Sequence, residues 1–289
     1  MTQRGGTKGR SALDWVGIFL RGMAMGTADL VPGVSGGTIA FLTGIYEELL
    51  ASLAGLRWSL VGVARRDGIA AAWKAGNFNF LLALVAGMAS AVVGFSGLLH
   101  FLLEQHPVLL WSFFFGLVAA SVPTMLRGTT MNGTSMRHAA GAVVVGAFIA
   151  WTVTGLPELI ADPGLMELVL AGALGICAML LPGISGSFVL VILGAYPVVI
   201  KAVAELDFLR LGAVGVGMLA GLLLFSRGLD RLFRRHRDVA VALLSGFLLG
   251  SLRKLWPWEG APVGDIWPAA ICALAGAGIM LLLSRVSRA

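Results

Sequence analysis

Long apolar segments separated by short polar links dominate the pattern along the chain. A helix that crosses the hydrocarbon core of a bilayer needs about 20 predominantly apolar residues. The apolar segments of the first half are Leu13–Leu30, Val34–Leu53, Phe78–Leu103, Pro107–Leu126 and Ala139–Leu156. Those of the second half are Leu168–Leu181, Ile184–Ile200, Leu211–Phe225, Val239–Leu252 and Ile266–Ser284. This pattern predicts an all-α polytopic membrane protein, because only helices satisfy every backbone polar group within one segment.

Composition strengthens this prediction and excludes other classes of protein. Of the 289 residues, 58% are hydrophobic and only 12% are charged, whereas soluble domains carry about 25% charged residues. A soluble enzyme and a disordered chain are both excluded. The net charge of +6 does not indicate nucleic-acid binding, because basic residues accumulate in the cytoplasmic loops of membrane proteins.

The two sets of apolar segments are related by an internal repeat. A shift of 150 positions superposes Pro32, Gly33, Ser35, Gly36, Gly44 and Tyr46 on Pro182, Gly183, Ser185, Gly186, Gly194 and Tyr196. A shift of 130 positions superposes Phe78, Gly87, Met88, Phe95, Ser96, His106, Gly116 and Ser121 on Phe208, Gly217, Met218, Phe225, Ser226, His236, Gly246 and Ser251. Two ungapped runs in the same order predict a duplication, with a longer loop after the second segment of the first half.

The charges of the loops predict the topology, because loops rich in Lys and Arg stay in the cytoplasm. The basic residues of the loops assigned to the cytoplasm are Lys8, Arg10, Arg57, Arg65, Arg66, Lys74, Arg127, Arg137, Arg227, Arg231, Arg234, Arg235, Arg237, Arg285 and Arg288. The links Glu104–His106 and Glu158–Glu167 contain no Lys or Arg and are assigned to the outside. The exceptions to this scheme are Lys201, Arg210, Arg253 and Lys254.

The repeats are therefore predicted to have inverted topology, since His106 lies in an outside link and its copy His236 in an inside one. Each repeat contains a helical hairpin broken at Pro-Gly, plus three transmembrane helices. The hairpin is expected to be re-entrant, and the alternative is two full crossings. The predicted organisation is a cytoplasmic tail (1–12), a first repeat (13–156), an extracytoplasmic linker (157–167) and a second repeat (168–289). Both termini are predicted to be cytoplasmic. Inverted repeats are typical of secondary transporters, whose substrate site lies between the repeats near the midplane.

The breaks in the two hairpins carry the candidate binding chemistry. Proline and glycine interrupt a helix, and the Ser, Gly and Thr residues that follow favour a new helix N-terminus. Such a terminus exposes N–H groups and binds anions such as phosphate. The predicted phosphate-binding residues at the breaks are Ser35, Gly36, Gly37, Thr38, Ser185, Gly186 and Ser187. The alternative is a plain glycine-rich packing turn.

Charged residues within apolar segments are costly and usually functional. Arg21 lies in the middle of the first segment and suits an anionic group as a forked donor. Asp29 and Glu47 either couple transport to an ion or pair with Arg21, whereas Glu48 is expected to face the headgroups. None of the four has an ionisable copy in the second half, so the first hairpin carries the charge chemistry.

Arg253 and Lys254 precede the aromatic stretch Trp256–Trp258. Basic and aromatic residues together are typical of an anchor at the membrane surface. The alternative role is capture of an anionic headgroup at the outer face.

Catalytic interpretations have less support. Gly33–Gly37 fits the pattern of a nucleophile elbow and resembles the active-site serine motif of rhomboid-type intramembrane proteases. However, a serine nucleophile needs a base within reach, and the four histidines lie at segment ends or in loops. No metal-ligand spacing and no phosphate-binding nucleotide loop occur, so no metal or other cofactor is expected.

Several of these motifs resemble the bacterial polyprenyl-phosphate transporter family (PopT-like), formerly a family of unknown function. The first motif comprises Arg21-Gly22, Ala28–Ala40 and Gly44–Glu47; Leu181–Ser187 and Gly250–Trp258 are similar to motifs of the second half. The resemblance covers nearly the whole chain from Arg21 onward.

This resemblance implies a non-enzymatic, multi-pass transporter in the bacterial plasma membrane. It would recycle undecaprenyl phosphate, or a related polyprenyl phosphate, from the outer to the inner leaflet as a flippase for cell-wall biogenesis. Membrane lipids are expected partners, and transport would be coupled to protons or sodium or driven by the lipid gradient itself. The alternatives are a small-anion transporter or channel, and an intramembrane lipid phosphatase or serine protease.

Overall fold

The computed structural model describes residues 10–30, 35–57, 59–127, 134–156, 163–258 and 266–286. Several predicted features lie outside these ranges. They are most of the cytoplasmic tail, Pro32 and Gly33 of the first break, and residues 157–162 of the linker. Within the described ranges every regular element is a helix.

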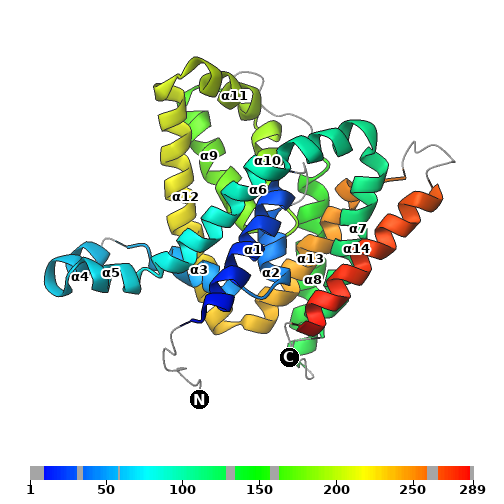
Figure 1. The fold of residues 1–289 in the computed structure, drawn as a ribbon, viewed down its shortest axis with the longest axis horizontal. Helices are drawn as coiled ribbons and strands as arrows, with labels where there is room; N and C mark the ends of the chain where they lie inside the picture. Colours follow the sequence, from blue (N-terminus) through cyan, green and yellow to red (C-terminus); the bar gives the residue numbers. More distant parts are fainter. Residues whose placement is uncertain are drawn as a thin grey trace.

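Eight helices are described in the first half of the chain: α1 (Ala12–Asp29), α2 (Gly36–Leu42), α3 (Tyr46–Gly55), α4 (Ser59–Asp67), α5 (Ile69–Ala75), α6 (Phe78–Gln105), α7 (Pro107–Leu126) and α8 (Thr134–Val153). Six are described in the second half: α9 (Leu165–Leu180), α10 (Gly186–Ile192), α11 (Ala195–Glu205), α12 (Phe208–Arg235), α13 (Arg237–Leu255) and α14 (Ile266–Val286). Figure 1 shows their arrangement.

The predicted class, a polytopic all-α membrane protein, agrees with the lengths and apolarity of the helices. Among the described residues four helices are long and apolar enough to cross a membrane, namely α6, α7, α8 and α12. The bent pair α10–α11 brings the number to five if it is one span. Three crossings were predicted in each half. In the first half three described helices meet the test of length and apolarity, whereas in the second half only α12 meets it alone, and α14 is a shorter apolar helix.

The segments that follow the two Pro-Gly breaks, Val34–Leu53 and Ile184–Ile200, are not continuous helices. The chain turns again at Gly44 and at its copy Gly194, which have φ values of 76° and 64°. A positive φ is favourable for glycine because it has no Cβ. In the second half the two resulting helices, α10 and α11, make an angle of 109°.

A second difference lies in the long loop between α3 and α6. The sequence pattern predicts a loop there, but the structure contains the two short helices α4 and α5. Figure 1 shows this pair extending away from the rest of the molecule. The pattern missed them because each helix is shorter than three turns and has a mainly exposed surface.

Glycines let the long helices pack closely. The same glycine contacts occur in both halves, at positions related by the shifts of 150 and 130 residues. In the first half Gly22 lies against the carbonyl group of Leu84, which joins α1 to α6. In the second half Gly172 lies against that of Val214, which joins α9 to α12 in the same way. Small residues at helix interfaces allow this close approach in membrane proteins.

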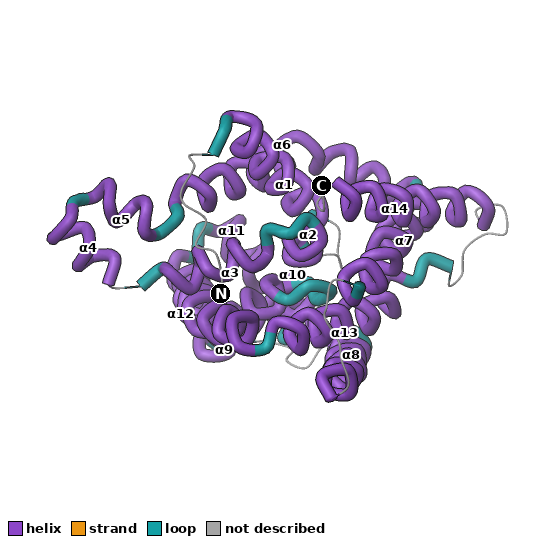
Figure 2. The backbone as a smooth tube through the Cα atoms, turned by 90° about the horizontal axis from the view of Figure 1, so that it is seen from below, coloured by secondary structure: helices purple, strands orange, loops and turns teal. Residues whose placement is uncertain are grey.

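The remaining long helices pack across the two halves. Gly116 of α7 lies against the carbonyl group of Ala273 in α14. The copy of this contact joins Gly246 of α13 to Val143 of α8. These pairs hold the halves together, and the short helices α2 and α10 lie near the middle of the molecule (Figure 2).

Candidate functional site

At the first break, a carboxylate from the end of α1 binds the N-terminus of α2. Oδ1 of Asp29 accepts a hydrogen bond of 2.6 Å from the backbone N–H of Gly36, the first residue of α2. Oδ2 is buried and has no hydrogen-bond partner among the described residues. Asp29 therefore occupies the position at the start of α2 where an external anion was predicted.

Ser35 satisfies the next donors of α2. Its hydroxyl accepts from the N–H of Gly37 at 3.1 Å, and its carbonyl accepts from the N–H of Thr38 at 2.9 Å. The first three N–H groups of α2 consequently have partners within the protein. In this conformation they are not free to bind phosphate, so binding at Ser35, Gly36, Gly37 and Thr38 stays a prediction.

The second break has a different cap. The hydroxyl of Ser185 makes no cap to α10 and lies 2.9 Å from the hydroxyl of Ser187. Gly186 packs against the backbone of Gly175 in α9. The ammonium group of Lys254 lies 4.8 Å from the centre of the Phe188 ring, one turn into α10. A basic side chain from the end of α13 thus reaches the start of α10.

The two breaks contact each other directly. The hydroxyl of Ser35 donates to the carbonyl of Met179 at 3.1 Å, and the N–H of Gly183 donates to the hydroxyl of Thr38 at 2.9 Å. The residues predicted to bind phosphate at the second break are 185–187. The first break instead contacts the segment just before them, at the end of α9.

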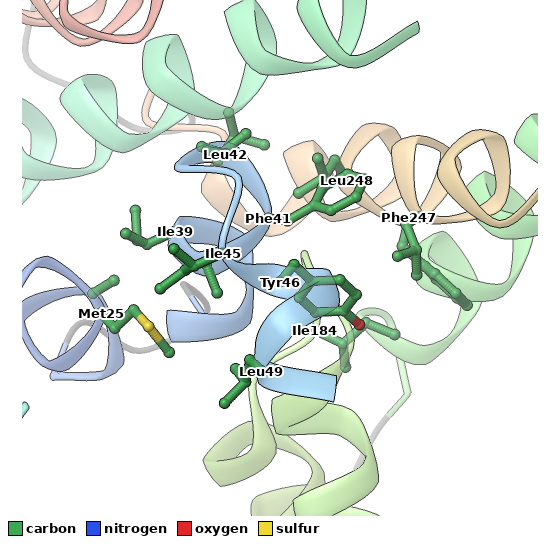
Figure 3. Close-up of a cluster of buried hydrophobic side chains, with 14 of the residues drawn as sticks. Met25, Ile39, Phe41, Leu42, Ile45, Tyr46, Leu49, Ile184, Phe247 and Leu248 are labelled. Atoms are coloured by element: carbon green, nitrogen blue, oxygen red, sulfur yellow. The ribbon is translucent and has the colours of Figure 1, made fainter. Parts of the chain in front are cut away.

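Tyr46 adds a third connection that the sequence did not indicate. Its buried hydroxyl donates to the carbonyl of Leu180 at 2.7 Å. Figure 3 shows its ring among Phe41, Ile184 and Leu248, which come from α2, the second break and α13. In the sequence, Tyr46 stands out only because the 150-position shift superposes it on Tyr196. This match does not indicate which residue its hydroxyl bonds to.

Arg21 lines a cavity of about 340 Å³ between α1, α2, α7 and α14, hereafter groove 1. The groove is lined mainly by apolar side chains, such as Ile39 and Leu117. Arg21 forms no hydrogen bond or ion pair with any residue that the structure describes. Its guanidinium runs back along α1 toward Gly17, where no side chain intervenes.

Glu47, the other residue predicted as a possible partner of Arg21, pairs with a different residue. Glu47 accepts from Arg237 at 2.8 Å, which ties the start of α3 to the start of α13. Glu48 pairs with Arg10 at 2.6 Å. Glu47 and Asp29 therefore both have other contacts, and the pairing of either with Arg21 is not observed among the described residues.

Arg253 lies in an aromatic environment. It donates to the carbonyl of Trp151 at 3.3 Å, and its guanidinium lies 4.8 Å from the centre of that ring. Trp256 and Trp258 follow and pack edge-on against Phe115. This arrangement suits the predicted anchor at the membrane surface, and headgroup capture by Arg253 and Lys254 stays a prediction.

The serine of the elbow-like motif has a structural role in this conformation. Its hydroxyl donates to the carbonyl of Met179 and accepts from the N–H of Gly37 as the cap of α2. No described histidine is hydrogen-bonded to Ser35. The arrangement required for a serine nucleophile, a hydroxyl bonded to a base, is thus not seen in the described residues.

Comparison with known proteins identifies the family. Residues 25–264 match the family model described as undecaprenyl phosphate translocase-like. The chain belongs to this family. The match spans both breaks and most of the helices described above, as the resemblance of the first motif predicted.

Two curated relatives agree with this membership, and both are named polyprenyl-phosphate transporter. The relative from Vibrio cholerae is 42% identical over 249 residues, which cover 86% of this chain and 79% of the relative. The relative from Staphylococcus aureus is 34% identical over 290 aligned residues, which cover 94% of this chain and 97% of the relative. No solved structure gives a significant match to this member of the family.

Proposed function

We propose that this protein transports a polyprenyl phosphate, such as undecaprenyl phosphate, across the bacterial plasma membrane as a flippase. The observation that carries the proposal is the position of Arg21, which has no partner among the described residues, in an otherwise largely apolar groove. The names of the two relatives support the same substrate class. The proposed direction is from the outer to the inner leaflet, which returns the carrier lipid for cell-wall biogenesis.

The chemistry of the substrate fits this site. An unpaired phosphate in hydrocarbon costs many kcal/mol, so the protein must replace its water. A guanidinium supplies two parallel donors to a phosphate. The polyprenyl chain needs no such replacement and packs against apolar walls. A small soluble anion has no hydrocarbon to pack against these walls. The apolar walls therefore favour a lipid substrate over a small anion.

We assign both termini to the cytoplasm and the two repeats to inverted topology. Two observations support this assignment. The same glycine contacts occur in both halves at the offsets of the sequence repeat. In Figure 1, α6 rises from its start beside α5, whereas its copy α12 descends from its start beside α11. Copies that run in opposite directions are expected of an inverted repeat.

Transport requires the contact between the two breaks to open. The predicted phosphate donors near Ser35 are occupied by Asp29 and by Ser35 itself. We propose that rearrangement of the breaks frees the donors at Gly36 and Gly186 for the phosphate, which then passes on to Arg21. Asp29 would leave Gly36 during this step, which makes it our candidate for the group that couples transport to protons.

Lipid movement in reconstituted vesicles tests the function. Polyprenyl phosphate is added to both leaflets, and an impermeant phosphatase then removes the phosphate exposed on the outside. With the protein, nearly the whole pool should become accessible, whereas empty vesicles should lose only the outer half. Equal fractions with and without protein would contradict the proposal.

Variants of Arg21 connect the function to the site. Arg21→Ala should reduce binding and movement of the lipid by at least about tenfold, because a charge-assisted bond is lost. Arg21→Lys should restore part of the activity, since a point charge does not reproduce the forked geometry. Arg65→Gln, in the extended α4–α5 pair, is the control and should behave as wild type.

A further inference from the structure

A second cavity, groove 2, is lined in part by copies of the residues that line groove 1. Groove 2 has a volume of about 320 Å³ and lies between α8, α9, α10, α12 and α13. Eight of the thirteen described residues that line it are copies of residues that line groove 1. The matched pairs include Thr27 with Cys177, Ile39 with Val189, and Leu117 with Phe247.

The two grooves differ in polarity. Arg21 of groove 1 corresponds to Ala171, which is buried and does not line groove 2, and Thr43 corresponds to Leu193, which does. The hydroxyls of Thr27 and Thr43 donate to carbonyls of their own helices. Arg21 is therefore the group in groove 1 that is left to bind an anion, and the described residues that line groove 2 include no charged side chain.

The contact between the two breaks separates the grooves. Ala28 and Ile39 line groove 1, and Ala178 and Ile184 line groove 2. The hydrogen bonds that join the first break to the segment 179–183 lie between these two sets of residues. The contact between the breaks thus lies between two largely apolar grooves.

We infer that the grooves are unequal lipid sites: groove 1 selects the phosphate-bearing end of a polyprenyl phosphate, and groove 2 holds a hydrocarbon chain whatever its headgroup. This inference rests on the proposed function and deepens it. Because the guanidinium of Arg21 runs toward the start of α1, the bound phosphate lies at the end of groove 1 nearest that helix start. With the proposed topology, this is the side that faces the cytoplasmic leaflet.

Thiol protection at equivalent positions tests the inference. Cys177 is the natural probe of groove 2 in a Cys272→Ser protein. For groove 1, Thr27→Cys is combined with Cys177→Ser and Cys272→Ser. Both proteins are placed in phosphatidylcholine nanodiscs and treated with a small membrane-permeant maleimide. Labelling rates are measured with polyprenyl phosphate, with the uncharged polyprenol of equal length, and with inorganic phosphate.

The two lipids should slow labelling of Cys177 equally. In the Thr27→Cys protein, polyprenyl phosphate should protect about tenfold better than polyprenol, the factor expected of one charge-assisted bond. Adding Arg21→Gln should remove this preference and leave protection at Cys177 unchanged. Inorganic phosphate should protect neither position, because it lacks the chain.

A steric variant provides an independent measurement. Ala24 is exposed in groove 1, so Ala24→Trp should fill the groove and abolish protection by either lipid. Ala220 is equally exposed on α12 but lines neither groove, and Ala220→Trp is the matched control.

Equal protection by the two lipids at position 27, or none, would overturn the inference. The vesicle assay separates this result from failure of the function. If the wild-type protein moves the lipid while the grooves give no protection, the inference alone is wrong. If it moves no lipid, the proposed function is wrong.

Discussion

Arg21 and Asp29 lie on the same helix about two turns apart, yet they face different surroundings. The arginine side chain runs back toward the start of α1 and lines groove 1. The carboxylate lies at the other end and binds the first N–H of α2. The proposed binding of the phosphate and the proposed control of the first break are therefore assigned to two different residues, which single substitutions can resolve.

Replacing Asp29 by Asn tests whether this residue carries a proton. The amide oxygen can still accept from the N–H of Gly36, so the fold should persist. If Asp29 is the coupling group, lipid binding should be retained and the pH dependence of transport should disappear. Weaker binding with unchanged pH dependence would instead mean that Asp29 only holds the break in place. Binding and flux measured across a pH series distinguish the two outcomes.

Tyr46 is expected to stabilise the contact between the two breaks. It is 1% exposed, and its hydroxyl bonds to the carbonyl of Leu180. Tyr46→Phe should lower the free energy of unfolding by about 1–3 kcal/mol, because a buried acceptor loses its donor. Tyr196, its copy, is 40% exposed and forms no hydrogen bond among the described residues. Tyr196→Phe is thus the control, and equal thermal stability of the two variants would refute the expectation.

At the scale of elements, glycine determines how closely the long helices approach. Gly87 of α6 lies against the carbonyl of Phe19 in α1, and its copy Gly217 lies against that of Val169 in α9. Any side chain at these positions meets backbone, which has little freedom to move. The packing of α1 on α6 therefore positions Arg21 and Asp29 through residues that carry no functional group.

Gly87→Val should separate α1 from α6 and lower the midpoint of thermal unfolding in detergent by several degrees, because overpacking costs about 1–3 kcal/mol. Gly94 lies on the same helix with nothing near the position of an added Cβ. Gly94→Val has the same effect on helix propensity and serves as the control. Equal loss of stability in the two variants would mean that propensity, not helix packing, is responsible.

At the scale of the whole molecule, the proposed inversion has a direct test in two matched histidines. His106 and His236 both precede a helix, α7 and α13, and both are exposed. In a protein without Cys177 and Cys272, His106→Cys should react with an impermeant thiol reagent from the outside of intact cells. His236→Cys should react only after the membrane is opened. Labelling of both variants from the same side would exclude inverted topology.

The sequence by itself determined the class, the repeat and the family of this protein. The apolar segments and their low charge predicted membrane helices without reference to other parts of the chain. The repeated Pro-Gly and glycine positions located both breaks and many of the helix contacts. These properties are local or periodic, so they can be read along the chain. They also drew attention to Arg21 and Asp29, whose charges are unusual in such segments.

Only the tertiary structure decided how these residues are used. Asp29 caps α2 across the break, Glu47 pairs with Arg237, and Arg21 is left without a partner in groove 1 among the described residues. The bond from Tyr46 to Leu180 joins residues 134 positions apart. Such pairings depend on which helices meet in space, and several partners were compatible with the same sequence pattern. The partner of a buried charge is therefore set by packing, because desolvation makes each group bind whatever donor or acceptor the fold brings nearest.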